Sequence, residues 1–286
     1  MTAAATTNVT NPGTRLEIQI VTTRASSLHT NHALIKGEKS MILVDAPFSR
    51  ADTHRLIGDL LETGKELEKI IITHDHPDHF FGLDLLLDTF PNAVAIAHAS
   101  VVEDILIDAP RGLDRWREKI GKLAPRYIAI PQVWNDDHVM LEGERIELIG
   151  PVPGDANRIV MVWVPQLKTL VASDVLFNEV HLWVGEHFEE HRAAWLKALD
   201  QIKTLDPEVI VAGHKRPHLP DDIGSWDYTR DYLLSFEKHL AQASNSDDLA
   251  RRIEQDYPET VDVLGGFLLG NSTKVAMREI PPVNQP

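Results

Sequence analysis

The histidine-rich segment Thr73–Gly82 constrains this chain more than any other feature. It reads Thr-His-Asp-His-Pro-Asp-His-Phe-Phe-Gly and places three histidines and two carboxylates within six positions, directly after the apolar run Ile70–Ile72. A strand that ends in such a cluster presents imidazole and carboxylate groups from one tight loop, and these groups together suit zinc or a similar divalent ion. A lone histidine is more often a surface residue or a satisfied core donor, but the combined pattern His-x-His-x-Asp-His indicates a metal centre.

This pattern is the signature loop of the metallo-β-lactamase superfamily, which the chain resembles over about residues 15–215. Upstream, segment 33–45 resembles the opening hairpin of that family and its Asp. Downstream, segment 170–177 resembles the strand that carries the bridging aspartate, and segment 209–214 the strand that ends in the last histidine. The resemblance implies a first metal position at His74 and His76, a second at Asp78, His79 and His214, and Asp174 as the bridge.

One loop departs from the family pattern. The family usually supplies a third histidine for the first metal in a Gly-x-x-His loop, and here segment 150–157 reads Gly-Pro-Val-Pro-Gly-Asp-Ala-Asn. The expected histidine aligns with Pro153, which has no ligand atom. We therefore predict a weakened first position and a second position that fills first. Asp155 is either a replacement ligand or an ordinary turn residue.

The implied activity is metal-dependent hydrolysis. A divalent ion lowers the pKa of bound water to about 7 and polarises a carbonyl group. Asp78 is predicted to be both a ligand and the proton acceptor, and His181, which follows Asp174 closely, a pocket residue or oxyanion donor. The chain has no cysteine, so it lacks the Cys ligand of one β-lactamase subclass and looks more like the lactonase and glyoxalase II branches. We expect zinc, one or two ions, with iron or manganese as alternatives, and cleavage of an ester, lactone or amide.

Two other functions stay open. A mononuclear non-haem iron oxidase or dioxygenase could use the same scaffold, and bound iron with oxygen consumption would reveal it. A non-catalytic binding protein could use the old pocket without metal. Segment 104–137 is a further candidate, because it is able to act as a lid and an arginine on it could bind a substrate carboxylate. Its candidate residues are Arg111, Arg115, Trp116, Arg117 and Tyr127. The alternative for that stretch is a solvated helix face.

Composition fits a globular enzyme and limits its partners. Hydrophobic residues make up 43% and charged residues 25% of the 286 residues, and the formal net charge is −15. This charge argues against nucleic acid, which requires clustered Lys and Arg, so we expect a small-molecule substrate. The sequence contains no run of about 18 apolar residues, so we expect no membrane-spanning segment. The first residues lack the basic start and apolar core of a signal peptide, which favours the cytoplasm.

The resemblance implies an α/β fold, a four-layer αββα sandwich, here with C-terminal helical additions. Apolar patterns predict strands at 15–23, 40–46, 69–73, 93–97, 145–149, 158–164, 168–173 and 209–212. They predict helices at 51–63, 80–89 and 190–204, and two helices within 100–123 that join at Pro110–Gly112. We expect a single domain over 15–280, in which 226–280 is a helical appendage that covers the sheet or forms an interface such as that of a homodimer. Residues 1–14 and 281–286 are expected to be disordered and flexible, respectively.

Overall fold

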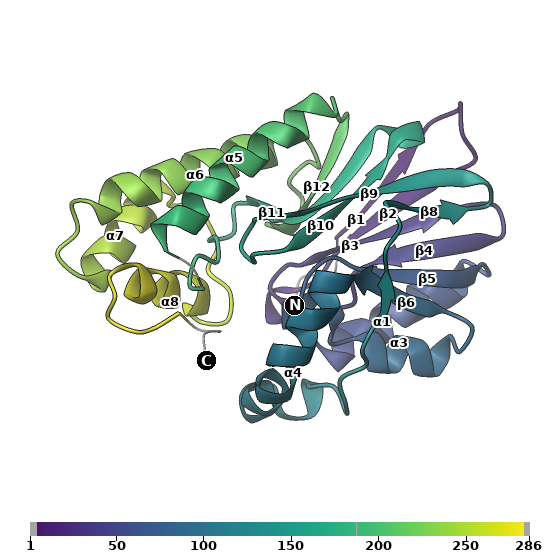
Figure 1. Ribbon diagram of the computed structural model, residues 1–286, viewed down its shortest axis with the longest axis horizontal. Coiled ribbons are helices and arrows are strands. Elements are labelled where there is room, and N and C mark those ends of the chain that lie inside the picture. The colour runs from purple at the N-terminus through teal and green to yellow at the C-terminus, as the bar shows by residue number, and fades with distance from the viewer. Residues whose placement is uncertain (1–4, 187, 283–286) are drawn as a thin grey trace.

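Two β-sheets form the centre of the molecule in the computed structural model, which describes residues 5–186 and 188–282 (Figure 1). The first sheet has, in order across it, β1 (Ala5–Thr10), β2 (Glu17–Thr22), β3 (Asn31–Lys36), β4 (Ser40–Val44), β5 (Glu66–Ile72), β6 (Val94–His98) and β7 (Gln132–Trp134). The second has β12 (Val209–Lys215), β11 (Thr169–Asn178), β10 (Ile159–Val164), β9 (Glu144–Val152) and β8 (His138–Leu141).

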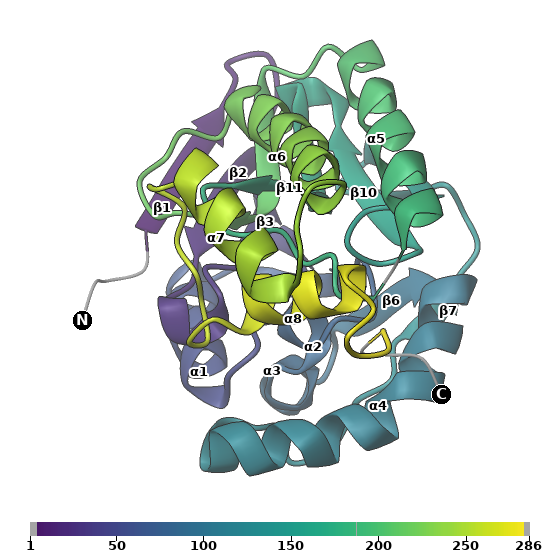
Figure 2. The same ribbon diagram turned by 90° about the vertical axis from the view of Figure 1, so that its left-hand side faces the viewer.

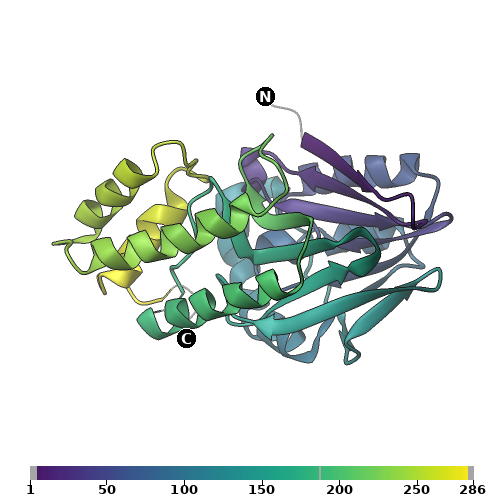
Figure 3. The ribbon, with the colours of Figure 1, turned by 90° about the horizontal axis from the view of Figure 1, so that it is seen from above.

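Helices cover the outer face of each sheet, which confirms the expected four-layer sandwich (Figures 1 and 3). The helices are α1 (Arg50–Glu62), α2 (Pro77–Phe80), α3 (Leu83–Thr89), α4 (Ala99–Ile120), α5 (Glu189–Thr204), α6 (Gly224–Leu240), α7 (Ser246–Asp256) and α8 (Phe267–Ala276). Short 3-10 turns are η1 (Ala25–Ser27), η2 (Gly121–Leu123) and η3 (Pro165–Leu167). No helix in the described part of the chain is long and apolar enough to cross a membrane.

The strands divide their apolar residues between two cores because successive side chains point to opposite faces of a sheet. In β5, Ile71 packs between the two sheets, whereas Ile70 and Ile72 pack under the helices. In β4, Ile42 likewise faces the other sheet while Leu43 faces the helices. Continuous apolar runs therefore mark strands that are buried on both faces, and β5 contains most of the short strand predicted at 69–73.

The structure corrects two predicted boundaries. Residues 5–10, expected to be disordered, form β1, which pairs antiparallel with β2 from Ala5 opposite Thr22 to Thr10 opposite Glu17. Backbone hydrogen bonds to the edge of the sheet hold this strand. Its sequence has little apolar alternation from which a strand could be predicted. Residues 11–14, also expected to be disordered, form the turn between β1 and β2, in which the Thr14 N–H donates to the Asn11 carbonyl at 3.1 Å. The parts of the two expected disordered ends at 1–4 and 283–286 lie outside the described residues.

The two helices expected within 100–123 are one helix, α4, which continues through the predicted break. Ile105, Ala109 and Leu113 recur at a four-residue spacing on both sides of the Pro110–Gly112 stretch and are all buried, Ile105 and Ala109 within the helix-side core. Burial of this continuous stripe outweighs the one backbone hydrogen bond that a proline removes. The helix expected over 80–89 is observed as α3, which begins at Leu83, and the short helix α2 precedes it and ends at Phe80.

The C-terminal helices form a body beside the sandwich, and α8 lies across its open end (Figure 2). α6 is anchored to β11, because Thr229 Oγ1 accepts a hydrogen bond from the Phe177 backbone N–H at 2.8 Å. α8 is anchored to the segment after β11, because Ser272 Oγ accepts from the Val184 N–H at 3.0 Å. The appendage therefore covers the sandwich edge at which the strands β5, β11 and β12 end.

Candidate metal centre

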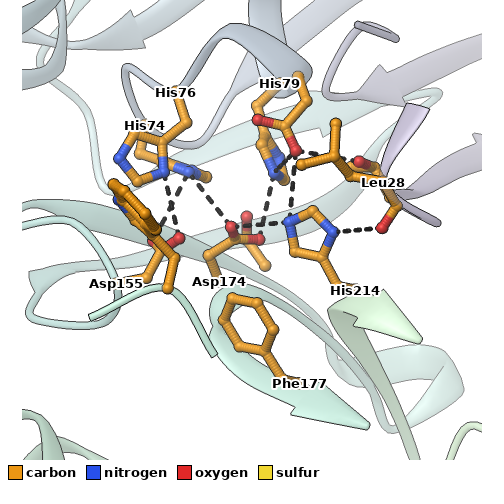
Figure 4. Close-up of polar contacts among 12 residues, drawn as sticks. Leu28, His74, His76, His79, Asp155, Asp174, Phe177 and His214 are labelled. Carbon is orange, nitrogen blue, oxygen red and sulfur yellow. Dashed lines mark hydrogen bonds and ion pairs between the residues drawn. The ribbon is translucent and has the colours of Figure 1, made fainter. Parts of the chain in front are cut away.

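Seven buried histidines and aspartates meet where β5, β11 and β12 end (Figure 4). They fall into two groups, within each of which one ligand atom per residue lies within 4.8 Å of the others. The first group comprises His74, His76, Asp155 and Asp174, and the second Asp78, His79 and His214. All six residues predicted from the sequence as ligands are present, and Asp155 is the addition.

The loop after β5 supplies the first histidines with fixed ring orientations. His74 Nδ1 lies 2.9 Å from Thr73 Oγ1, so its Nε2 faces the centre. On α2, His79 Nδ1 lies 2.8 Å from Asp45 Oδ2, and its Nε2 also faces the centre. Asp45 binds the Thr73 backbone N–H at 2.9 Å as well. One buried carboxylate after β4 therefore positions both the loop and a candidate ligand, the outer contact that metal-binding histidines usually have.

His214 and His76 also have one ring nitrogen bound to a residue that lies far away in the sequence. His214 Nδ1 at the end of β12 lies 2.9 Å from the Leu28 carbonyl oxygen. His76 is reversed, because its Nε2 lies 3.0 Å from Glu186 Oε1 and its Nδ1 faces the centre. Each of the four imidazoles thus has one nitrogen bound to the protein and one directed inward. Sequence reasoning missed Glu186, which no motif marks and which is 110 residues from His76.

Asp155, which the sequence left open as a replacement ligand or a turn residue, lies in the first group beside His74 and His76. Its Oδ2 lies 3.1 Å from His76 Nδ1 and its Oδ1 lies 3.9 Å from His74 Nε2. Its backbone N–H donates to the Asp174 carbonyl at 3.1 Å. The loop can approach β11 this closely because residue 154 is glycine, where an added Cβ would lie 2.7 Å from the same carbonyl oxygen. The aspartate is therefore fixed at the centre by its backbone.

Asp174 lies between the two groups of residues. Its Oδ1 is 3.1 Å from His79 Nε2 and its Oδ2 is 3.1 Å from His214 Nε2, while His74 Nε2 is 3.7 Å from Oδ2. The pairing of β11 with β12 shifts register on either side of Ser173, which has a φ of 49°. Such bulges redirect side chains beside functional sites. The bridging role implied by the resemblance fits this position.

Burial and neighbouring charges at the centre shift the pKa values of its histidines and aspartates strongly. Burial alone would lower the pKa of His76, but the carboxylates of Asp155 and Glu186 hold that pKa well above its ordinary value. Burial, followed by the neighbouring Asp174 carboxylate, raises the pKa of Asp155 well above its usual range. Burial keeps the pKa of His74 well below its usual value. Closely spaced buried carboxylates are costly unless a proton or a cation lies between them.

The donor set fits a divalent ion. Four buried atoms at the centre have no hydrogen-bond partner of suitable geometry within the described ranges: His74 Nε2, His79 Nε2, Asp155 Oδ1 and Asp174 Oδ1. His79 Nε2 and Asp174 Oδ1 are 3.1 Å apart and form an ion pair only when the ring is protonated. Buried polar atoms are almost always satisfied, so unsatisfied ones that face one another need a reason. Imidazole nitrogens and carboxylate oxygens are suitable ligands for zinc, iron and manganese. A metal centre accounts for all four atoms at once.

A pocket with aromatic walls opens above this centre. Its empty volume is about 940 Å³, including the part open to solvent. The residues that line it include His76, Asp78, Asp155, Asp174 and His214 on the floor, and Phe80, Phe81, Arg115, Trp116, Trp183, Phe267 and Leu268 on the walls. α4 and α8 meet across it, because the rings of Trp116 and Phe267 are 5.7 Å apart. The predicted lid segment therefore contributes to the pocket.

His181 is not among the residues that line the pocket, contrary to its predicted role as a pocket residue or oxyanion donor. Its ring is buried beneath α6, where Nδ1 lies 2.8 Å from the Tyr232 hydroxyl. Burial lowers its pKa to about 4, so it is a neutral core histidine at physiological pH. Asp78, the other predicted catalytic residue, does line the pocket, and its Oδ2 accepts a hydrogen bond from Thr30 Oγ1 at 3.0 Å.

Comparisons with known proteins agree with this geometry. Residues 27–214 match the family model described as the metallo-beta-lactamase superfamily. A metallo-beta-lactamase type 2 from Pseudomonas aeruginosa is 28% identical over 189 residues, which cover 65% of this chain and 68% of the relative. The solved structure of VMB-1 has a TM-score of 0.59 at 15% identity and covers 82% of this chain and 99% of its own. A metallo-beta-lactamase from Pontibacter korlensis has a TM-score of 0.57 at 15% identity, with 79% and 98% covered.

Proposed function

Because the chain belongs to the metallo-beta-lactamase superfamily, most of whose members are metal-dependent hydrolases, we propose that it hydrolyses a small-molecule ester, lactone or amide at a two-metal centre. The observation that carries the proposal is the set of four buried donor atoms without hydrogen bonds at the centre, two of which belong to the pocket-lining residues Asp155 and Asp174. Those atoms are contributed by both groups of residues, which supports two ions and not one.

The second group favours hydrolysis over the rival oxidase. A mononuclear iron site needs two histidines and one carboxylate with open positions, which His74, His76 and Asp155 could provide. Such a site would leave Asp78, His79 and His214 buried together without an ion. Two divalent ions together supply a water of lowered pKa and stabilise charge on a carbonyl oxygen. We therefore retain the oxidase as the second candidate.

The residues of the chain position the reactants around that chemistry. Asp78 faces the pocket and is the group placed to accept a proton from water, while Thr30 Oγ1 orients its carboxylate. Asp45 and Glu186 keep the rings of His79 and His76 in place. The helices over the pocket limit the access of bulk water, which strengthens electrostatic interactions inside it.

The pocket walls favour a substrate with an apolar group. The ring of Trp183 stacks on that of Phe267 with centroids 5.3 Å apart and an interplanar angle of 12°. Trp116 packs against Phe267 at an interplanar angle of 58°, so the three rings form an angled apolar wall of the pocket, which suits an acyl or aromatic substituent. Arg115 also lines the pocket, where its guanidinium could bind a substrate carboxylate.

The direct test removes the ions and restores them. Protein stripped with a chelator should lose hydrolysis of a panel of esters, lactones and amides, and should regain it with about two zinc ions per chain. Asp78→Asn should lower kcat by roughly 10²–10⁴-fold with an unchanged circular dichroism spectrum. The matched control is Asp114→Asn on the exposed face of α4, whose side chain is 82% exposed. Hydrolysis that survives complete metal removal would refute the proposal, and oxygen consumption with bound iron would favour the rival.

A second variant tests the apolar walls. Phe267→Ala should raise KM for long-chain or aromatic esters by about 10-fold or more, because it removes a large apolar contact, while acetyl esters change little. Leu234→Ala on α6, 43% exposed, is the matched control. An equal effect of Phe267→Ala on short and long acyl groups would show that this wall does not select the substrate.

A further inference from the structure

The two positions of the centre have the same kinds of donor. Counting Asp174 in both, the first position has two imidazoles and two carboxylates, from His74, His76, Asp155 and Asp174. The second also has two imidazoles and two carboxylates, from Asp78, His79, His214 and Asp174. The expected third histidine of the first position would have made the two positions unlike. Asp155 makes them alike in composition.

An ion pair alone does not account for Asp155. Its Oδ2 is within 3.1 Å of His76 Nδ1, but its Oδ1, also buried, makes no hydrogen bond to any described residue. A carboxylate that served only to balance a charged His76 would face a ring whose other nitrogen already lies 3.0 Å from Glu186 Oε1. The residue is 1% exposed, so water does not satisfy the second oxygen from bulk. A cation between Asp155, His74 and Asp174 satisfies both oxygens.

A carboxylate in place of an imidazole makes the set of ligands at the centre more negative and harder. The carboxylates of Asp78, Asp155 and Asp174 together carry three negative charges, and two dications carry four positive charges. With a third histidine in place of Asp155, only two negative charges would remain at the centre. Carboxylate oxygen favours harder ions such as manganese, while imidazole suits zinc and iron. One more anionic oxygen donor should therefore reduce the advantage that zinc has over harder ions.

We propose that Asp155 is the fourth protein ligand of the first position, and that it makes the centre a matched pair of two-imidazole, two-carboxylate sites that accepts manganese ions in both positions with a reduced preference for zinc. This inference rests on the proposed two-metal centre. It replaces the sequence-based expectation of one tight and one weak ion. The loop built on Gly154 holds the carboxylate in place, so binding at the first position needs no loop movement.

The test measures ion binding without reference to turnover. Chelator-stripped wild-type protein, Asp155→Asn and Asp155→His are titrated with MnCl2 and ZnSO4 without oxygen, and bound metal per chain is determined by elemental analysis. Electron paramagnetic resonance of the manganese-loaded protein reports whether two ions lie close enough to couple. We expect two manganese ions per wild-type chain with a coupled signal, and one uncoupled ion in Asp155→Asn.

The Asp155→His variant measures the preference of the first position between zinc and manganese. Asp155→His should raise the ratio of zinc affinity to manganese affinity at the first position by about 10-fold or more, since a nitrogen donor replaces an oxygen donor. Asp114→His on the exposed face of α4 controls for an added histidine. Circular dichroism checks folding, and if Asp155→His is unfolded, Asp155→Asn and the size-changed Asp155→Glu decide the question through metal content.

The outcomes separate this inference from the proposed function. Two tightly bound manganese ions in Asp155→Asn would overturn the assignment of Asp155 as a ligand. Two zinc ions but a single manganese ion in the wild type, or an unchanged affinity ratio in Asp155→His, would overturn the matched-pair preference while the two-metal hydrolase stands. A wild-type chain that binds neither ion would remove the proposed function itself.

Discussion

Gly213 shows how closely the backbone approaches the centre. An added Cβ at this position would lie 1.7 Å from Asp174 Oδ1 and 2.7 Å from the Ser173 carbonyl carbon. The second contact is with backbone, so the strand cannot yield simply by turning a side chain. Glycine is needed here for close approach, because β12 must bring His214 beside the bridging carboxylate.

We predict that Gly213→Ala displaces Asp174 and lowers bound metal below one ion per chain. Elemental analysis of the purified variant checks this. Gly58→Ala is the matched control, because its Cβ would meet nothing within 4 Å inside α1, and it should be neutral or stabilise by about 0.5–1 kcal/mol. Full metal content in Gly213→Ala would mean that Asp174 does not have to occupy its observed position.

At the scale of elements, Glu142 connects the turns of the two sheets. It lies in the turn between β8 and β9, and its carboxylate accepts hydrogen bonds from the backbone N–H groups of Glu38, Lys39 and Ser40 at 2.9, 2.7 and 2.8 Å. Glu38 and Lys39 belong to the turn between β3 and β4, and Ser40 is the first residue of β4. The N–H groups lower the pKa of Glu142 to about 2.

This contact should give a pH-dependent contribution to stability. The folded pKa of Glu142 is about 2, below its ordinary value of 4.5, so the contribution is complete above pH 4.5 and is lost as pH falls toward 2. We therefore expect the urea midpoint of the wild type to exceed that of Glu142→Gln at pH 7 and the difference to shrink below pH 4.5. Chelator is included throughout, so that metal loss in acid does not contribute. A difference that stays constant from pH 7 to pH 3 would contradict this assignment.

At the scale of the molecule, the centre joins both sheets and the loops between their strands. The first sheet supplies the loop after β5 together with α2, and the second supplies β11, β12 and the loop before β10. An ion bound by residues from all of these stabilises the folded state and not the unfolded chain. Metal should therefore contribute to the stability of the whole sandwich.

We predict that chelation lowers the thermal midpoint by roughly 10 °C. An ion at 1,000 times its Kd stabilises by about 4 kcal/mol, and each kcal/mol shifts the midpoint by roughly 2–4 °C in a chain of this size. Differential scanning calorimetry with and without chelator measures it. Asp174→Asn, which removes the shared carboxylate charge, should show a much smaller shift, and a wild-type midpoint that does not respond would contradict a structural contribution of the metal.

The sequence by itself determined the parts of the molecule that depend on neighbours in the chain. The cluster from His74 to His79 follows a strand within a few residues, so backbone geometry alone brings these donors together. Ser49 precedes α1 and accepts from the Asp52 N–H at 3.2 Å, the local contact expected at the start of a helix. Alternating burial in β4 and β5 follows from the period of a strand. Four of the six predicted ligands belong to this one local segment.

Only the tertiary structure decided which distant groups complete the centre. The family pattern places Pro153 at the expected ligand position, whereas the contact of the Asp155 N–H with Asp174 brings the Asp155 carboxylate beside His74 and His76. Glu186 and α8 also reach the pocket from far along the chain. His181, close to Asp174 in sequence, turns into the core toward Tyr232. Local sequence patterns determine the face of a strand or helix on which a side chain lies. Packing between elements determines which distant residues that side chain contacts.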